Sequence, residues 1–182
     1  EGGEKIGPLR EEGSCGRQTG TRVRVWPDPK YFDSPRVAMS ELERLLRSKA
    51  VLLSGVEVRL DAEQAGGGVL SKTWSYPEGL AGYLKELAGD HEPVAPLFAG
   101  EKYAGRDDAS FAPGEGASWA LAWFESPVPS ESYVNLIPTV NGGTHESGLR
   151  AGVFEAMKSF IEHHTLLPRG VKLQQEDVCG RM

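Results

Sequence analysis

The 182-residue sequence has no long run of apolar side chains. Its longest apolar stretches, such as Ala50–Leu53 and Trp119–Phe124, fall far short of the roughly 20 residues that a membrane-spanning helix needs. The first residues, Glu-Gly-Gly-Glu-Lys, lack the apolar stretch of a signal peptide. We therefore expect a cytoplasmic protein that makes no contact with a membrane.

Cysteine is scarce, because only Cys15 and Cys179 occur, far apart and in no metal-ligand spacing. We expect neither to form a structural disulfide, and two unpaired thiols suit a reducing compartment. Positive charge is also short, since 20 Lys and Arg against 26 Asp and Glu leave a net charge of −6. This balance argues against a uniformly basic nucleic-acid-binding protein, although it leaves room for a local basic surface.

The remaining composition is ordinary for a globular protein, with 39% apolar and 25% charged residues. A chain of this length is sufficient for one or two compact domains with a core. The sequence has no internal repeat, and its only low-complexity tract is the glycine run Gly66–Gly68.

Residues 1–33 have the pattern of a β-hairpin. A strand at Lys5–Leu9 and a glycine-rich loop precede a second strand at Thr21–Trp26, in which valines alternate. Ser34-Pro35 then offers an N-cap followed by proline at the first helical position. The expected helix carries leucines on one face and charged residues on the other: Leu42, Leu45 and Leu46 against Glu41, Glu43, Arg44 and Arg47.

A second hairpin is expected after this helix. Apolar and polar residues alternate over 56–60, Gly66–Gly68 makes a turn, and Lys72–Tyr76 forms the returning strand. Pro77–Gly79 is the expected domain boundary, and a short helix follows at Leu80–Leu87.

The C-terminal half contains the clearest helix, predicted at Thr144–His164 with Thr144 as its N-cap. Apolar residues recur there at three- and four-residue steps: Leu149, Val153, Ala156, Met157, Phe160 and Ile161. Three strand candidates precede it: Leu97–Ala99, Ser118–Trp123 and Tyr133–Pro138. Another element begins at Gln174–Arg181.

The glycine pair before the long helix, Gly142-Gly143, is the first candidate for chemistry. A helix N-terminus presents unpaired N–H groups and the positive end of the helix dipole, so this loop has the parts to hold a phosphate or a carboxylate. Taken alone, the pattern favours a tight strand-to-helix turn capped by Thr144. The glycine spacing and the Lys-Ser/Thr pair of a P-loop are missing.

Two groups of segments carry a resemblance to a known family. Asn135–Gly148, followed by Leu149-Arg150, is similar to the transducer domain of bacterial type II DNA topoisomerase ATPase subunits, the B subunits of gyrase and topoisomerase IV. Gln18–Asp28 resembles the last ATP-site strand of the same family's GHKL ATPase domain. Further segments resemble the topoisomerase IV branch rather than gyrase: Tyr31–Arg36, Leu45–Gly55, Leu166–Leu173 and Glu176–Val178.

The resemblance implies an α+β fold. Residues 1–79 would form the C-terminal part of a GHKL (Bergerat) ATPase sandwich. Residues 80–182 would form a transducer domain, incomplete at its C-terminus, with a left-handed βαβ unit like that of ribosomal-protein-like second domains.

Three site residues follow from the resemblance. Thr21 matches a family threonine at the floor of the adenine pocket, and a small hydroxyl can both donate and accept in an apolar cleft. Val23, two residues on, would line the same pocket because it points to the same face of the strand. Arg150 matches an arginine facing the DNA cavity of the dimer; a solvated arginine or an ion pair between helices is the alternative.

The residues that hydrolyse ATP in the family have no match here, so no residue is assigned as catalytic or as a metal ligand. The general-base glutamate, the Mg²⁺-binding asparagine and the glycine-rich lid belong upstream of residue 1 in the family order. The lysine that reaches the γ-phosphate belongs downstream of Met182. Glu131 and Asn135 have the Glu-x-x-x-Asn spacing, but the segment leads into a predicted strand and not along a helix. They are therefore not assigned to ATP hydrolysis or Mg²⁺ binding. ATP and Mg²⁺ are the expected cofactors, and the chain alone is expected to be inactive.

The other polar clusters are interpreted as structural. His145, His163 and His164 match no metal-cluster spacing, and the last two diverge on a helix because they are adjacent. Asp107-Asp108 and Glu176-Asp177 are expected to be solvated loop and helix-start charges.

The resemblance also implies partners: DNA, a second B subunit and the DNA-cleaving A subunit. ATP would close the B dimer around one duplex, and the transducer would drive that duplex through a double-strand break. The alternatives are a phosphate- or nucleic-acid-binding module without topoisomerase activity, or a purely structural and interaction domain. RNA binding is disfavoured, because clustered Lys and Arg with interleaved aromatics are missing.

Overall fold

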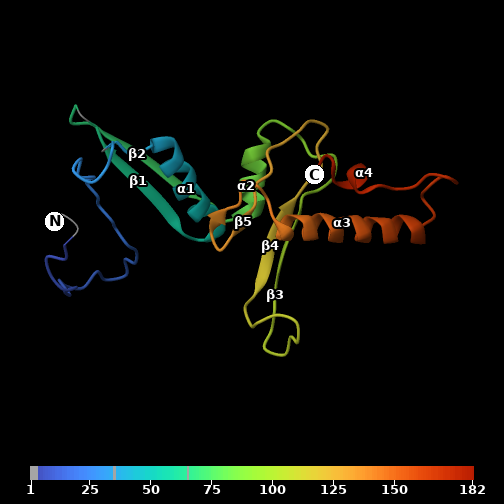
Figure 1. The fold of residues 1–182 in the computed structure, drawn as a ribbon, viewed down its shortest axis with the longest axis horizontal. Coiled ribbons are helices and arrows are strands. Elements are labelled where there is room, and N and C mark those ends of the chain that lie inside the picture. Colours follow the sequence, from blue (N-terminus) through green and yellow to red (C-terminus); the bar gives the residue numbers. More distant parts are fainter. Residues whose placement is uncertain (1–3, 35, 65) are drawn as a thin grey trace. The chain divides into compact units, whose positions relative to one another are not determined.

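The computed structural model describes residues 4–34, 36–64 and 66–182, which form a mixture of short sheets and helices (Figure 1). The chain divides into two compact units, one ending at Leu42 and the other spanning Glu43–Met182. No helix in the described parts of the chain combines the length and the apolar character that crossing a bilayer requires.

The first unit corrects the prediction for the N-terminal segment. No strand occurs in residues 4–34, so the hairpin expected between Lys5–Leu9 and Thr21–Trp26 is wrong. The side chains of Val23 and Val25 are 78% and 72% exposed. An alternating strand is stable only where its backbone is paired and one face is buried, and an isolated two-stranded hairpin is marginal in water.

The first helix, α1, spans Met39–Leu52 and therefore begins later than Ser34-Pro35 implied; Pro35 itself lies outside the described residues. Its buried positions are Ser48, Ala50 and Val51, near its C-terminal end. Leu45, which was expected to face the core, is 43% exposed. Burial here follows the position of the neighbouring sheet and not the leucine stripe.

The second hairpin is confirmed as β1 (Glu57–Glu63) and β2 (Val69–Ser75), paired antiparallel with Val58 opposite Trp74. The short helix is confirmed as α2 (Gly79–Ala88). Together with α1 these elements enclose one apolar core, formed by Ala50, Val51, Tyr76 and Tyr83, against which Val58, Trp74, Leu80 and Leu87 pack.

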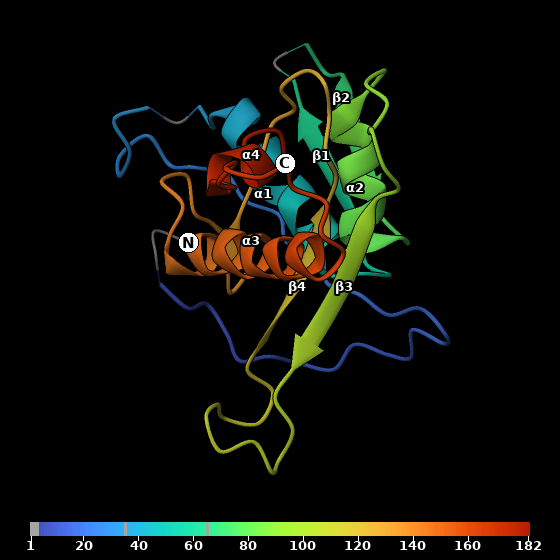
Figure 2. The same ribbon diagram turned by 90° about the vertical axis from the view of Figure 1, so that its right-hand side faces the viewer.

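A second, smaller core joins the other end of α2 to a long hairpin. Strands β3 (Phe98–Tyr103) and β4 (Gly116–Leu121) pair antiparallel, and Ala88, Ala122 and Phe124 are buried together beyond them. Both views of the ribbon show the loop between β3 and β4 extending away from α2 (Figures 1 and 2).

The prediction of one continuous strand at Tyr133–Pro138 is wrong. The segment folds back on itself as β5 (Tyr133–Val134) and β6 (Ile137–Pro138), with Asn135 and Leu136 as a two-residue turn. Both turn residues have positive φ, 48° and 68°, as a type I′ hairpin turn requires. Glycine usually supplies this conformation, so the residue types at 135 and 136 are a weak signal for the turn.

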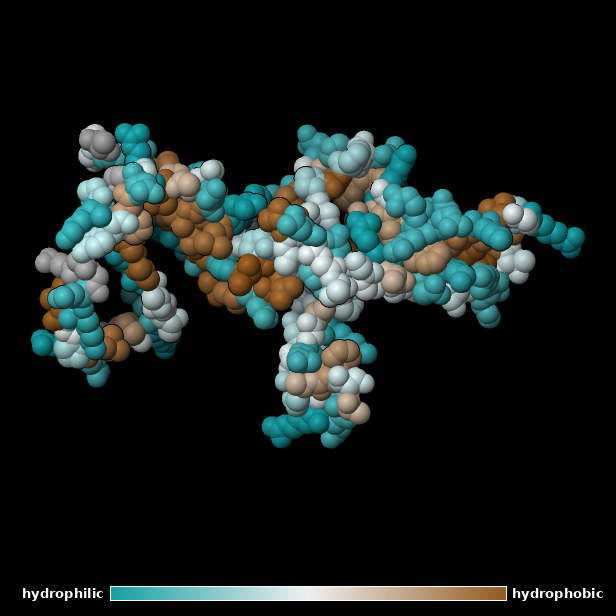
Figure 3. Space-filling model, viewed as in Figure 1, coloured by the Kyte–Doolittle hydropathy of each residue, from teal (hydrophilic) through white to brown (hydrophobic). Residues whose placement is uncertain are grey.

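The long helix is confirmed as α3 (Thr144–His163), and the last element as α4 (Gln175–Cys179). No residue of α3 is buried, and Met157 and Phe160 on its apolar face are 40% and 55% exposed. Figure 3 shows apolar surface along α3 among hydrophilic side chains. The α+β class is confirmed. The strand pairs found among the described residues are all antiparallel, so the left-handed βαβ unit stays a prediction.

Candidate functional site

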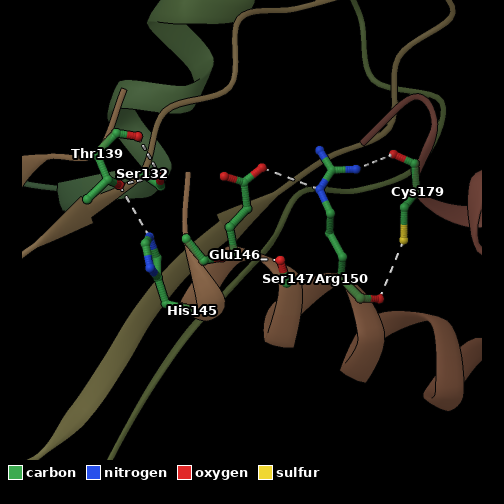
Figure 4. A network of polar contacts seen from close by, with 8 residues as sticks. Ser132, Thr139, His145, Glu146, Ser147, Arg150 and Cys179 are labelled. Atoms are coloured by element: carbon green, nitrogen blue, oxygen red, sulfur yellow. Dashed lines mark hydrogen bonds and ion pairs between the residues drawn. The ribbon is translucent and has the colours of Figure 1, made fainter. Parts of the chain in front are cut away.

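The start of α3, with the β5–β6 hairpin and the glycine loop before it, brings together the C-terminal features singled out in the sequence (Figure 4). A pocket of about 570 Å³ opens beside it. The lining residues are mostly polar and come from α1, from the segment before β5, from both strands of the β5–β6 hairpin, from the glycine loop and from α3: Arg44, Pro129, Ser130, Glu131, Ser132, Tyr133, Pro138, Thr139, Val140, Asn141, Gly142 and Glu146.

A chain of hydroxyl contacts ties the hairpin to the helix. The hydroxyls of Ser132 and Thr139 lie 2.6 Å apart, and the Thr139 N–H donates to the Ser132 carbonyl at 2.8 Å. Thr139 Oγ1 also lies 3.3 Å from His145 Nε2 (Figure 4). His145, in the first turn of the helix, is therefore bonded to the residue that follows β6.

The helix begins differently from the prediction. Gly143 is the N-cap and Thr144 is the first helical residue, with no side-chain cap, so Thr144 as cap is wrong. Gly142 has φ +67°, and a Cβ placed there would lie 2.7 Å from Oε2 of Glu146. Because a carboxylate of the chain itself lies against the glycine loop, near the positive end of the helix, this arrangement disfavours an external phosphate.

Arg150 joins α3 to α4. Its Nη1 donates to the Cys179 carbonyl at 3.1 Å, and its Nε lies 3.5 Å from Glu146 Oε1, one turn earlier. The Cys179 thiol lies 3.6 Å from the Arg150 carbonyl, which closes the contact from the other side (Figure 4). The contact with α4 is thus a hydrogen bond to a backbone carbonyl, whereas the ion pair with Glu146 lies within α3 and does not join two helices. The DNA-facing role of Arg150 stays a prediction.

Thr21 and Val23 lie in the first unit, and both side chains are exposed. The spacing of two that suggested a shared face holds only within a strand, and these residues form none. Their role in adenine binding stays a prediction.

A carboxylate–tyrosine bridge was not foreseen. The hydroxyls of Tyr83 on α2 and Tyr133 on β5 both donate to the same oxygen of Glu131, the first at 2.9 Å. Burial, and then the bond to Glu131, raise the pKa of Tyr83 to about 12. The same two causes, in the same order, raise the pKa of Tyr133 above its ordinary value. Fifty residues separate the two tyrosines, so no local pattern could have indicated the bridge.

A second polar group adjoins it. Arg47 Nε donates to the Tyr76 hydroxyl at 2.9 Å, and the Tyr76 hydroxyl donates to Glu86 Oε2 at 2.6 Å. Arg47 also pairs with Glu86 and lies over the Tyr83 ring, 4.9 Å from its centroid. α1, the end of β2 and α2 are thus held by one connected set of bonds.

The remaining candidates behave as local structure. Asp108 accepts the backbone N–H groups of Ser110 and Phe111, and Asp177 forms a capping box with Gln174 at the start of α4. The helix-start interpretation of Asp177 is confirmed. In the described part of the chain no group of three or more His, Cys, Asp or Glu residues is placed to hold a metal ion.

Comparison with known proteins identifies the family to which this arrangement belongs. The DNA gyrase B family model matches residues 79–182. The B subunit of DNA topoisomerase 4 from Escherichia coli (strain K12) is 42% identical over 189 residues, covering 100% of this chain and 28% of that protein. The corresponding protein of Haemophilus influenzae is 44% identical over 186 residues, with the same coverage of both proteins.

The chain therefore spans only 28% of the length of these curated relatives. Among solved structures, the 43K ATPase domain of Thermus thermophilus gyrase B, in complex with an aminocoumarin, superimposes with a TM-score of 0.64. That match is 21% identical and covers 83% of this chain and 39% of the other, and it shows a shared fold. Because the family model covers more than half of the sequence, the chain belongs to the DNA gyrase B family.

Proposed function

We propose that the chain is part of the ATP-binding subunit of a type II topoisomerase of the topoisomerase IV kind. In this role it couples ATP binding and hydrolysis to the passage of one DNA duplex through a double-strand break. The observation that carries the proposal is the identity of 42% to the B subunit of a DNA topoisomerase 4 over the whole of this chain. The partners are DNA, a second B subunit and a DNA-cleaving A subunit.

The division of labour within the chain follows the same reasoning. Residues 1–79 supply the end of the ATPase domain, and residues 80–182 supply the transducer. The start of the family match at residue 79 supports this boundary. The polar bonds from Arg47 to Tyr76 and Glu86 cross it, which suits two domains that must move as coupled bodies.

The nucleotide is ATP with Mg²⁺, whose metal ligands are residues outside this chain. Thr21 and Val23 are the residues here that would line the adenine site. A threonine hydroxyl can accept from the adenine amine and donate in turn, and the valine adds apolar contact. Both side chains are exposed, so neither is committed to a core.

Arg150 is proposed to meet the backbone of the transported duplex. A guanidinium binds phosphate oxygens without reading sequence. Its side chain keeps 30% exposure while Nη1 bonds to Cys179. The guanidinium is thus held by a hydrogen bond to α4, while part of the charged side chain stays accessible to a phosphate.

The test is ATP-dependent decatenation of linked DNA circles by the complete B subunit with its A subunit. We expect decatenation with ATP and none without nucleotide. Thr21→Ala should raise the KM for ATP about two- to tenfold, as loss of one hydrogen bond in a binding pocket does. Thr73→Ala, on exposed β2, is the matched control and should leave KM unchanged. Decatenation that proceeds equally without ATP would refute the proposal.

A further inference from the structure

The turn between β5 and β6 places two consecutive non-glycine residues in the left-handed region of backbone conformation. Asn135 tolerates its φ of 48°, since asparagine often adopts the left-handed region, but Leu136 at φ 68° is an outlier. Such a conformation is unfavourable in free energy and persists only where surrounding structure holds it.

What holds the turn is α1. The Lys49 ammonium donates to the Leu136 carbonyl, and this bond joins residues 87 positions apart. Lys49 stands between two buried positions, Ser48 and Ala50, so its backbone is fixed in the core of its unit. The turn is therefore attached to a rigid part of α1 by a charge-assisted bond.

The base of the same hairpin is attached a second time. Tyr133, the first residue of β5, donates to Glu131, which also accepts from Tyr83 at 2.9 Å. The Tyr83 ring lies under Arg47 of α1, 4.9 Å from its guanidinium carbon. Tip and base of the hairpin thus both connect to one turn of α1, at Arg47 and Lys49.

The hairpin continues directly into α3. Thr139, the residue after β6, contacts His145 in the first turn of α3 at 3.3 Å and Ser132 at 2.6 Å (Figure 4). Any displacement of the hairpin by α1 therefore reaches the start of the long helix through a few short bonds. Hydrogen-bonded and packed chains of this kind carry coupling between distant sites.

We propose that Lys49 and the Tyr83–Glu131–Tyr133 bridge are positioning residues that transmit movement of α1 to the β5–β6 hairpin and α3. In the complete enzyme they couple ATP use to DNA passage. This inference rests on the proposed function. Neither group touches the nucleotide or the DNA in this role; each fixes where the transducer helix begins relative to α1.

The experiment measures ATP hydrolysis and decatenation side by side, in the complete B subunit with its A subunit. Their ratio gives DNA circles released per ATP. Lys49→Met keeps the length of the side chain and removes its donor, and should lower this ratio about fivefold while the hydrolysis rate changes less than about twofold. Tyr133→Phe, which keeps the ring, should lower the ratio about threefold.

Matched controls separate coupling from a general loss of folding. Lys49→Arg retains a donor and should keep the wild-type ratio. Lys85→Met removes an exposed lysine that pairs with nearby Glu78, and Tyr103→Phe removes a hydroxyl bonded to Ser118 within the β3–β4 hairpin. Both controls should leave the ratio unchanged.

Each result is decisive. If the wild-type enzyme passes DNA without needing ATP, the proposed function fails and this inference fails with it. If the wild type couples the two activities and Lys49→Met and Tyr133→Phe couple them equally well, the inference alone is overturned. A proportional fall of both activities, with a lower melting temperature, overturns it as well, because that marks a purely structural role. If Lys49→Met does not fold, Tyr133→Phe decides the question.

Discussion

At the residue scale, the burial of Tyr83 and its hydrogen bond to Glu131 predict a specific alkaline response of the protein. Tyr83 is only 7% exposed, and burial with the bond to Glu131 raises its pKa from 10.0 to about 12. Between these two values the unfolded chain loses the Tyr83 proton while the folded chain keeps it. Stability from this group is therefore complete below pH 10 and declines as the pH rises toward 12.

The measurement is the urea midpoint of unfolding as a function of pH. The wild type should show a midpoint that falls between pH 10 and 12, and Tyr83→Phe should show a shallower fall over the same window. The variant is expected to be less stable by about 1 kcal/mol at neutral pH, because it lacks one hydrogen bond. Equal slopes for the two proteins would show that Tyr83 titrates normally in the fold.

Sequence reasoning at this scale succeeded where a role depends on neighbours along the chain. Asp177 was expected at a helix start, and there it forms the capping box of α4. It failed for Glu131, whose partners Tyr83 and Tyr133 come together only in three dimensions. For Arg150 the sequence left two alternatives, and the α3–α4 contact now seen depends on the position of a carbonyl that no residue pattern encodes.

At the scale of elements, the β3–β4 hairpin depends on a glycine in close backbone contact. A Cβ on Gly116 would lie 2.2 Å from the Lys102 carbonyl oxygen and 2.7 Å from the Tyr103 Cα, and neither backbone atom can move aside. Gly116→Ala should therefore destabilise the protein by about 1–3 kcal/mol, the usual cost of overpacking. Thermal unfolding followed by circular dichroism measures the loss.

Gly105, in the loop of the same hairpin, provides the matched control. A Cβ there meets nothing within 4 Å, and its φ lies outside the left-handed range. Gly105→Ala should leave the melting temperature unchanged or raise it slightly, since alanine narrows the unfolded ensemble. Similar melting temperatures for the two variants would show that β3 and β4 are not paired in this register.

Elements with a strong local period were predictable. The helix α3 and the hairpin β1–β2 appear where hydrophobic steps of three and four residues, and alternation around glycines, placed them. The segment 21–26 has the same kind of alternation and forms no strand, because a strand also needs a partner and a covered face. The fold-back at Asn135 and Leu136 was missed because leucine is a poor signal for a turn with positive φ.

At the scale of the whole molecule, several motifs in register identified the family, and the match over residues 79–182 confirmed it. Burial is distributed unevenly, since the buried residues found in the described chain all lie at Ser48 or beyond. Motif order carries no information on such a distribution. The predicted domain boundary after residue 79 comes from motif order, whereas the division after Leu42 comes from contacts within the folded chain. The two divisions therefore need not coincide.

The proposed function also leads to a prediction about ATP hydrolysis at the scale of the whole molecule. The 182-residue polypeptide is expected to release no phosphate from ATP with Mg²⁺, with or without DNA. Hydrolysis requires a base that activates water and ligands that hold the metal. The one glutamate four residues before an asparagine, Glu131, lies outside any helix and is already bonded to two tyrosine hydroxyls.

A phosphate-release assay, with the complete B subunit as positive control, tests whether the 182-residue chain hydrolyses ATP. Hydrolysis by the 182-residue chain that Glu131→Gln abolishes would reassign Glu131 as the base and place the catalytic centre in this chain.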